Sequence, residues 1–467
     1  MTLSILKSKY IGDRAFYRKV LAVAIPMMIQ NGVTNLVSLV DNIMVGAVGT
    51  EAMSGVSIVN QFLFIFNLLI FGAVSAAGIF TAQFHGKGDV EGVRHTFRFK
   101  FLIILIAGAL GTLVFAFASE LLIGSFLHES SSEGDLALTM SLAKDYLFVM
   151  LAGLIPYAIS QVYASTMRET GDAKLPMIAS SSAVAVNLAL NGLLIFGYLG
   201  FPRLGVVGAA IATVISRYVE LVILIISAHR RTDKYPFAHH VYRTFKIPVP
   251  LAKSIFLKGL PIMLNELLWA AAMTARNTCY STRGLDVVAG LNISMTVNQL
   301  FSVVYMSLGS AIAIIVGNLL GAGRIEQAKD EARKMLAFSL GASLIMGVLL
   351  AAISPVFPLI YNTTDEVRSI ATYAILVMAC VMPLQSIAHS AYFTIRSGGK
   401  VLITMLSDSV FVWVVAFPLA FVLSRFTDMN FHLLYLLCQG AEVIKVVFGA
   451  ILLNKVNWAR QIVSDNF

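Results

Sequence analysis

Charged residues are scarce in this sequence, and their scarcity excludes an ordinary soluble protein. Asp, Glu, Lys and Arg make up 13% of the 467 residues, whereas 58% are hydrophobic and the mean hydropathy is +0.82. A soluble chain of this length would carry about 25% charged residues to cover its surface. We therefore predict that most of the exterior faces lipid.

Cysteine is also scarce, and several common motifs are missing. The three cysteines, Cys279, Cys380 and Cys438, lie in apolar runs and suggest no disulfide framework. No GxxxxGK[ST] phosphate loop occurs, so direct ATP drive is not predicted, and we interpret the glycine pairs at 86–88 and 321–323 as tight turns. No catalytic arrangement stands out, and we expect a protein that is not an enzyme. Residues 1–20 contain neither an apolar core nor a small-residue cleavage site, so we expect no cleaved signal peptide.

Long apolar runs dominate the chain instead. They are long enough to cross a bilayer as helices, whereas barrel strands would be short and alternating. The sequence therefore predicts an all-α integral membrane protein with twelve transmembrane helices. The runs lie at about 20–44, 52–80, 100–124, 140–166, 175–199, 206–228, 254–281, 287–320, 335–360, 367–395, 401–424 and 430–454.

Lysine and arginine gather on one side of the predicted membrane. They concentrate at 7–19, 87–100, 168–174, 230–258 and 324–334, whereas the opposite loops mix Arg203 and Arg283 with acidic residues. By the positive-inside rule, both termini are cytoplasmic, which fits an even number of spans. We expect a multi-pass protein of the cell inner (plasma) membrane that contacts lipid. The net charge of +9 is explained by this topology, and no nucleic-acid partner is predicted.

The chain contains an internal repeat. An offset of 235 residues places Pro26 on Pro261 and Gly86 on Gly321, and an offset of 228 places Arg168 on Arg396. Each copy holds six spans, so both enter the membrane in the same direction. Such parallel repeats are used by alternating-access carriers. We predict an N-lobe at 1–230 with spans 1–6, a polar and basic cytoplasmic linker at 231–253, and a C-lobe at 254–467 with spans 7–12.

The first span carries a polar stripe that ends in a carboxylate. Asn31, Thr34, Ser38 and Asp41 are spaced three, four and three residues apart, which places them on one helical face. An ionisable group inside a span costs about 2.5–3.5 kcal/mol on insertion scales and indicates a function or a partner. Asp41 is therefore a candidate functional group, the alternative being a structural carboxylate capped by neighbouring hydroxyls near the outer end.

The fifth span repeats this pattern with amides. Ser180, Asn187 and Asn191 share one face. Amide and carboxylate oxygens are hard ligands that suit a small cation. These side chains could equally hydrogen-bond a protonated Asp41, or join helices by polar contacts worth about 0.6 kcal/mol each.

The second lobe holds further polar groups within its spans. Glu266 is a candidate proton or cation carrier, or else a salt-bridged structural acid, and it shares a face with Asn277. Arg276 occupies the repeat position of Asp41, and it could neutralise an acid such as Asp408 or bind an anionic group of a substrate. A polar stripe of Gln385, His389 and Tyr392 is interpreted as packing. Aromatic residues could line a cavity, although such residues usually pack: Phe62, Phe64, Phe66, Trp269, Phe301 and Tyr305.

At this level of detail the chain resembles the multidrug and toxic compound extrusion (MATE) family over essentially its whole length. The resemblance lies in LVDNIMVG at 39–46, RETGDAKLP at 168–176, LIFG at 194–197 and GVVGAAIAT at 205–213. It implies two six-helix bundles in a V-shaped molecule around a central cleft. It also implies export of small organic, often cationic, compounds by alternating access, driven by inward flow of protons or sodium.

The resemblance also assigns roles to residues. Asp41 matches the coupling carboxylate, with Asn187, Asn191 and Thr213 around it, and Asp41, Asn187 and Asn191 would be the ligands of a sodium ion; no other cofactor is expected. One branch of the family has a glutamate where Trp269 stands here and an aspartate in the tenth span that this chain lacks, so we place coupling mainly in the first lobe. The predicted substrate cleft comprises Asp41, Gln61, Glu266, Trp269, Asn277 and Gln299.

Two other functions fit the sequence less well. A lipid-linked precursor flippase of the same wider superfamily would be expected to have an arginine-rich central cavity, whereas the candidates for such a cavity within the spans are only Arg217, Arg276 and Lys445. A receptor or scaffold without transport is disfavoured by the repeat and by the acid within a span. We expect a cation-coupled antiporter that acts as a monomer.

Overall fold

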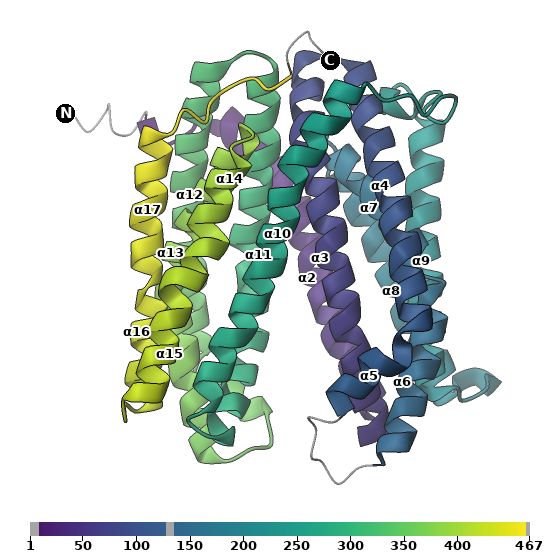
Figure 1. Cartoon of the computed structure of the whole chain (residues 1–467), viewed down its shortest axis with the longest axis vertical. Helices are drawn as coiled ribbons and strands as arrows, with labels where there is room; N and C mark the ends of the chain where they lie inside the picture. Colours follow the sequence, from purple (N-terminus) through teal and green to yellow (C-terminus); the bar gives the residue numbers. More distant parts are fainter. Residues whose placement is uncertain (1–8, 128–134, 464–467) are drawn as a thin grey trace. The chain divides into compact units, whose positions relative to one another are not determined.

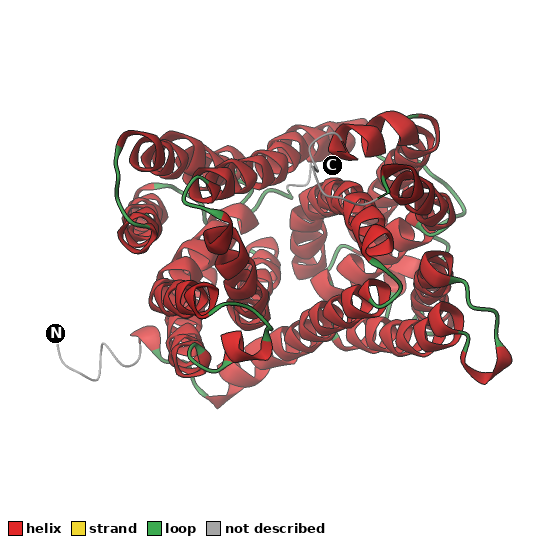
Figure 2. Ribbon diagram, turned by 90° about the horizontal axis from the view of Figure 1, so that it is seen from below, coloured by secondary structure: helices red, strands yellow, loops and turns green. Residues whose placement is uncertain are grey.

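The computed structural model describes residues 9–127 and 135–463, and in these ranges the chain forms helices joined by turns, with no β-strand (Figure 2). The first two residues of the basic segment at 7–19 lie outside this description. Within the described ranges, eleven helices are long and apolar enough to cross a membrane, and a pair bent by 48° supplies a twelfth if it forms one span. This confirms the prediction of an all-α membrane protein with twelve spans.

The helices follow one another along the chain, joined by turns and by longer segments (Figure 1). The first half contains α2 (Arg14–Gly46), α3 (Thr50–Lys87), α4 (Val90–Phe117), α5 (Ser119–Leu127), α6 (Leu136–Leu151), α7 (Leu154–Glu169), α8 (Lys174–Phe196) and α9 (Gly205–Arg230). The second half contains α10 (Val249–Ser281), α11 (Leu285–Gly321), α12 (Ile325–Ile353), α13 (Asp365–Ser397), α14 (Val401–Met405), α15 (Phe417–Phe426), α16 (Phe431–Gly440) and α17 (Glu442–Lys455). The bent pair is α6 and α7.

Side-chain caps define where several helices begin. Asp89 accepts a hydrogen bond from the backbone N–H of Gly92 at 2.8 Å, and Asn430 accepts one from that of Leu433 at 3.0 Å. Such caps satisfy N–H groups that have no partner within the helix. Because Asp89 starts α4, the basic residues Arg94, Arg98 and Lys100 belong to a helix and not to the loop in which the sequence pattern grouped them.

The described helices pack into two compact units. The N unit contains Ile29–Thr81 and Asp89–Ile255, and the C unit contains Met1–Met28, Ala82–Gly88 and Phe256–Phe467. The start of α2 and the end of α3 thus pack with the second half of the chain. The lobe boundaries at 230 and 254 stay predictions, because packing alone does not define which helices move together.

Two repeat-related glycines make a close helix crossing inside the C unit. A Cβ atom added to Gly86 of α3 would lie 1.9 Å from the carbonyl oxygen of Asn318. A Cβ atom added to Gly321 of α11 would lie 1.9 Å from the carbonyl oxygen of Gln83. The interpretation of these two glycines as turn residues was wrong, because both lie in the last helical turn, where a bare backbone is needed for the contact. The turns themselves use Gly88 and Gly323, which have φ of +80° and +73°.

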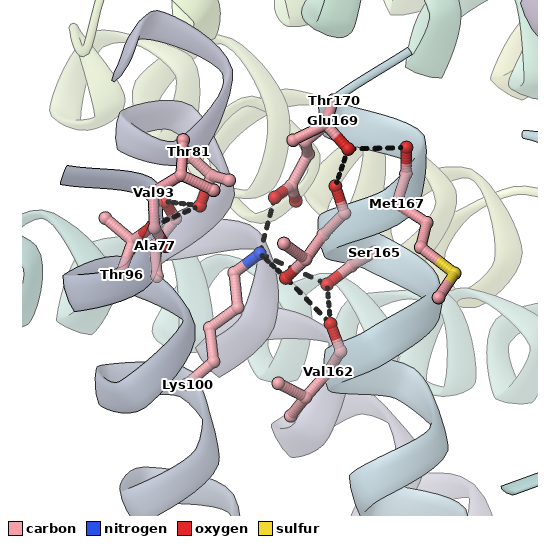
Figure 3. Close-up of polar contacts among 11 residues, drawn as sticks. Ala77, Thr81, Val93, Thr96, Lys100, Val162, Ser165, Met167, Glu169 and Thr170 are labelled. Atoms are coloured by element: carbon pink, nitrogen blue, oxygen red, sulfur yellow. Dashed lines mark hydrogen bonds and ion pairs between the residues drawn. The ribbon is translucent and has the colours of Figure 1, made fainter. Parts of the chain in front are cut away.

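A buried ion pair ties α4 to α7 inside the N unit (Figure 3). Lys100 has no exposed surface, and its Nζ donates to Ser165 Oγ and Thr166 Oγ1, each at 3.2 Å, while it pairs with Glu169. These contacts use all three N–H donors of the ammonium group. A Cβ on Gly78 of α3 would lie 2.3 Å from Glu169 Oε1, so α3 also approaches the pair closely.

The linker after α9 is docked onto the N unit. Tyr235, Phe237 and Val241 are almost completely buried. Arg98 Nε donates to the Val241 carbonyl at 2.9 Å, and Asp172 pairs with Lys234 and accepts a hydrogen bond from the Tyr235 hydroxyl. Although the sequence of this segment is polar and basic, its few apolar side chains anchor it.

Candidate functional site

Asp41 lies near the end of α2 in the N unit and meets two asparagines of α8. Asn191 Nδ2 donates to Asp41 Oδ1 at 2.6 Å, and also lies 3.3 Å from Asn187 Oδ1. The two asparagines are four residues apart, so they stand one above the other on the same helical face. Both are at least 95% buried, whereas Asp41 is partly exposed.

Thr213 joins this cluster from α9, which packs along α8. Its hydroxyl lies 3.3 Å from Asn187 Nδ2 and donates to the Ala209 carbonyl of its own helix at 3.0 Å. The hydroxyl proton is therefore used in the bond to the helix backbone, and the hydroxyl oxygen can still accept a hydrogen bond or a cation. The structure thus brings together all four residues that were predicted as the cation-coupling set: Asp41, Asn187, Asn191 and Thr213.

The Asn187 amide can face Asp41 with either of its ends. With the oxygen inward, Asn187 Oδ1 lies 3.2 Å from both carboxylate oxygens of Asp41, an arrangement of acceptors that a proton or a cation would stabilise. With the amide turned, the nitrogen donates to both Asp41 oxygens at 3.2 Å and the oxygen faces Thr213. Within the described chain, Asn191 Oδ1 is buried and receives no hydrogen bond.

This set of side chains suits some cations better than others. Among the described residues, no three His, Cys, Asp or Glu side chains gather in a way that could hold a metal ion. One carboxylate with neutral amide and hydroxyl oxygens suits a hard cation of low charge or a proton, and not a transition metal.

The other predicted cleft residues are divided between the two units. Asp41 and Gln61 belong to the N unit, whereas Glu266, Trp269, Asn277 and Gln299 belong to the C unit. Gln61 and Gln299 are exposed, and the other three C-unit residues are partly buried. The assembly of this set into one cleft stays a prediction.

The C unit has a polar centre that the sequence did not reveal. Lys445 Nζ donates to Asp408 Oδ1 at 2.7 Å, and Asn265 Nδ2 donates to Asp408 Oδ2 at 3.0 Å. Asp408 lies in a π-helical stretch, Leu406–Val410, a local irregularity that is frequent at functional sites. The predicted option that Arg276 pairs with Asp408 is not realised, because Lys445 takes that place.

The stripe of Gln385, His389 and Tyr392 is held by ring packing and by hydrogen bonds. His389 packs edge-on against Tyr305 with ring centroids 5.7 Å apart, and the Tyr305 hydroxyl lies 3.4 Å from Gln385 Oε1. Tyr392 accepts a hydrogen bond from Arg396 at 3.1 Å.

Asn265 could have been found through the repeat, which also singles out Lys445 among the basic residues within spans. The offsets that relate the two halves place Asn265 on Gln30 and Lys445 on Arg217. In the N unit Gln30 accepts a hydrogen bond from Arg168 at 3.2 Å, and Arg217 stacks over Tyr157 at 5.0 Å. Each unit therefore places polar side chains at these repeat positions. Matching polar residues between the two halves of the repeat would have pointed to them, whereas looking only for acidic residues within spans does not.

The family model named MatE matches residues 26–193 and 261–422, which together make up most of the chain. The chain belongs to the MATE family. This confirms the resemblance, and as a member of the MATE family the chain is a multi-pass membrane transporter and not an enzyme. The two matched stretches also correspond to the two halves of the repeat.

Individual MATE relatives support this membership over nearly the full length. The chain is 25% identical over 417 residues to the probable multidrug resistance protein NorM of Thermotoga maritima, covering 88% of this chain and 87% of the relative. It is 26% identical over 416 residues to the probable multidrug resistance protein YoeA of Bacillus subtilis. This match covers 87% of this chain and 86% of the relative.

Solved structures share the fold of this MATE chain. A crystal structure of a MATE protein in complex with MaL6 gives a TM-score of 0.82 at 20% identity, covering 97% of this chain and 99% of that one. A MOP-superfamily transporter from Pyrococcus furiosus gives a TM-score of 0.83 at 20% identity. This match covers 98% of this chain and 100% of that one. At these identities the likeness concerns the fold alone.

Proposed function

We propose that this MATE protein is an antiporter that exports small organic, often cationic, compounds in exchange for protons or sodium ions bound at Asp41. Two curated relatives are described as probable multidrug resistance proteins. The single observation that carries the coupling mechanism is the convergence of Asp41, Asn187, Asn191 and Thr213 in the N unit. No observation favours the flippase alternative.

Exchange follows from competition for one negative charge. A cationic substrate gains electrostatic stabilisation near Asp41 only while the carboxylate is ionised and uncompensated. A proton or a sodium ion at the same carboxylate removes that charge, so each ligand lowers the affinity for the other. Such reciprocal coupling between two ligands is the thermodynamic requirement for antiport.

The asparagines make the site responsive to the ion. An ionised Asp41 favours the Asn187 orientation in which the amide nitrogen donates to both carboxylate oxygens. A bound proton or cation favours the opposite orientation, which adds the Asn187 oxygen to the acceptors around it. Asn191 Oδ1, which receives no hydrogen bond from the described residues, would be a further oxygen ligand. For sodium, the protein ligands would be Asp41, Asn187 and Asn191.

The proposed setting is the cell inner membrane, with both termini in the cytoplasm and the protein acting as a monomer. The distribution of lysine and arginine along the chain supports this orientation. Export then requires the coupling ion to enter from outside and leave inside.

The test is efflux from proteoliposomes in which proton and sodium gradients are imposed independently. We expect one of the two gradients to drive substrate accumulation and Asp41→Asn to abolish it while membrane insertion is retained. Asp286→Asn, which removes an exposed carboxylate of α11, is the matched control. Normal gradient-driven transport by Asp41→Asn would place coupling elsewhere, with Glu266 as the next residue to examine.

A further inference from the structure

The segment that follows α17 lies against the ends of other helices of the C unit. We name residues 456–463 the strap; it leaves α17 as the yellow segment that crosses those helix ends in Figure 1. Trp458 and Ala459 are each 7% exposed, and Val463 is fully buried. The strap is therefore packed into the unit through its apolar side chains, although it forms no helix.

The strap supplies hydrogen bonds to the C-terminal ends of two helices. Gln461 Nε2 donates to the carbonyl of Gly321, the last residue of α11, at 2.8 Å. Arg460 Nε donates to the carbonyl of Gly398, which directly follows α13, at 3.3 Å. Carbonyl groups at this end of a helix have no partner within the helix, and the helix dipole favours a cation there. The strap thus satisfies groups that the two helices leave unpaired.

Gln83 of α3 holds the strap through both ends of its amide group. Its Nε2 donates to the carbonyl of Ser397 at 3.0 Å and to that of Arg460 at 3.3 Å. Its Oε1 accepts a hydrogen bond from the backbone N–H of Ile462 at 2.7 Å. Gln83 is fully buried, and these bonds use both of its N–H donors. The strap is therefore fastened to α3 as well as to α11 and α13.

Gln83 lies just past the point where α3 leaves one unit and enters the other. The helix packs in the N unit up to Thr81, whereas Ala82–Gly88 belongs to the C unit. Ala82 is 2% exposed, and its Cβ would lie 3.0 Å from a Cβ atom added to Gly317 of α11. If α3 moves together with the N unit, this end of the helix must detach from α11 and from the strap.

The repeat contains a counterpart of the strap that lacks this connection. The offset of 228 residues places Val463 on Tyr235 of the linker, and both side chains are buried. The linker is held by Asp172, which lies in the same unit and the same half of the chain. The offset of 235 places Gln83 on Asn318, whose buried Oδ1 has no hydrogen-bond partner among the described residues. Only the strap, of these two segments, is thus held by a helix from the opposite half.

We propose that the strap is a latch that keeps the ends of α3 and α11 together and must release Gln83 before these ends can separate. Its hydrogen bonds and buried side chains stabilise the crossing, so they add to the free energy needed to open it. The basic segments at 87–100 and 324–334 place these helix ends on the predicted cytoplasmic side. The role of the latch in transport rests on the proposed function, whereas the fastening itself is a property of the C unit.

The test measures how often the crossing opens, in the full-length chain in lipid nanodiscs and without substrate or ion gradient. Ala82→Cys supplies a thiol that a maleimide reagent reaches when α3 separates from α11. The native Cys438, which is free and 1% exposed, reports opening of the unit as a whole. Peptide mass spectrometry gives the labelling rate at each position.

We expect Gln461→Ala to speed labelling at residue 82 by roughly threefold to tenfold and to leave labelling of Cys438 unchanged, because one hydrogen bond to α11 is lost. Gln461 is exposed, so this change leaves the core intact. Shortening the chain after Lys455 removes the whole strap and should speed labelling further. Asn457→Ala, at another exposed position of the strap, and shortening after Val463 are the controls and should change nothing.

Two results would overturn the latch. One is unchanged labelling at residue 82 in Gln461→Ala, which is decisive even if the shortened chain does not fold. The other is equal acceleration at residue 82 and at Cys438, since the strap would then stabilise the unit as a whole. Efflux is measured separately. Faster labelling without gradient-driven efflux would count against the antiport function alone, whereas coupled efflux with unchanged labelling would count against the latch alone.

Discussion

At the scale of single residues, the site around Asp41 depends on which atoms each asparagine presents. Asn191 approaches Asp41 Oδ1 at 2.6 Å with its nitrogen, whereas Asn187 can present either end of its amide at 3.2 Å. The two asparagines therefore contact Asp41 differently, although they occupy neighbouring turns of the same helix face. In the proposed mechanism, Asn187 responds to the charge of Asp41, while Asn191 holds the carboxylate.

Replacing the two asparagines separately tests whether both belong to the ion site. We expect Asn187→Leu and Asn191→Leu each to weaken ion dependence more than substrate binding without a gradient, because the amides contact the carboxylate. The measurement is the ion concentration that gives half-maximal efflux, compared with substrate affinity in equilibrium binding.

Ser180→Leu on the same helix is a suitable control, since Ser180 belongs to the predicted stripe but not to the four-residue cluster. Equal losses of ion dependence and substrate affinity in the asparagine variants would favour polar packing over a coupling role.

At the scale of the element, the crossing of α3 and α11 depends on glycine. Gly86 and Gly321 each face the backbone of the other helix, and a backbone cannot move aside as a flexible side chain can. We expect Gly86→Ala to destabilise the protein by about 1–3 kcal/mol, the usual cost of overpacking. The lower unfolding temperature should be detectable in detergent-solubilised protein.

Gly341 provides the matched control for that substitution. It lies within α12, and a Cβ placed on it would meet no atom within 4 Å. Gly341→Ala should therefore be neutral or stabilise by up to about 1 kcal/mol through helix propensity. If both variants unfold at the same temperature, the close crossing does not contribute to stability.

The docked linker is a second element whose attachment can be tested, and it responds to pH. Burial alone would raise the pKa of the Asp172 carboxyl, but the hydrogen bonds from Lys234 and Tyr235 outweigh this effect and hold the pKa below its ordinary value of 3.8. Because the pKa is lowered in the folded state, the contribution to stability is present above pH 3.8 and is lost as the pH falls through the lower native pKa.

We therefore expect the linker to stay docked at neutral pH and to loosen in strong acid. Asp172→Asn should reproduce that loosening at neutral pH, with faster cleavage after Lys234 in limited trypsin digestion. Asp233→Asn, in which the changed carboxyl belongs to the neighbouring residue, is the control. Unchanged cleavage of Asp172→Asn would show that the buried Tyr235, Phe237 and Val241 hold the linker without help from Asp172.

At the scale of the whole molecule, the parallel repeat predicts that two lobes rock to open the cleft alternately to each side. Ser54 and Ala289 are equivalent under the offset of 235 residues. We expect cysteines at these positions to come close only in the inward-open state. Crosslinking them should arrest efflux, and reduction should restore it.

The control for that experiment is each single cysteine variant treated with the same reagent. Complete crosslinking of the pair without loss of turnover would contradict rocking of rigid lobes. Movement confined to one lobe, such as bending of α2 at Pro26, would then be the alternative to examine.

Much of the fold could be predicted from the sequence because the bilayer imposes strong local rules. Every backbone polar group in lipid must be paired within its own segment, so long apolar runs become helices wherever they occur. Among the described spans, one pair of helices is bent at a short break: α6 and α7 correspond to one predicted run at 140–166, interrupted at Ala152 and Gly153.

Asp41, Asn187 and Asn191 stood out in the sequence through helical spacing, which is a local property. Thr213 and the grouping of all four residues were implied by the resemblance to the MATE family. Asp41, Asn187, Asn191 and Thr213 do lie together in the structure, while their role in coupling stays a prediction. Lys100 was misplaced for an equally physical reason. A lysine at the edge of a span resembles a loop lysine until its partner is known, and that partner, Glu169, is sixty-nine residues away along the chain.

What the sequence determined by itself was the class of protein, its spans, its repeat and the polar stripes that hold Asp41, Asn187 and Asn191, since these depend on composition and period. Only the tertiary structure decided which charges meet. It paired Asp408 with Lys445 and left Arg276 Nε without a hydrogen-bond partner among the described residues, because pairing depends on distances of a few ångströms between helices that are far apart in sequence. No helical period encodes such distances.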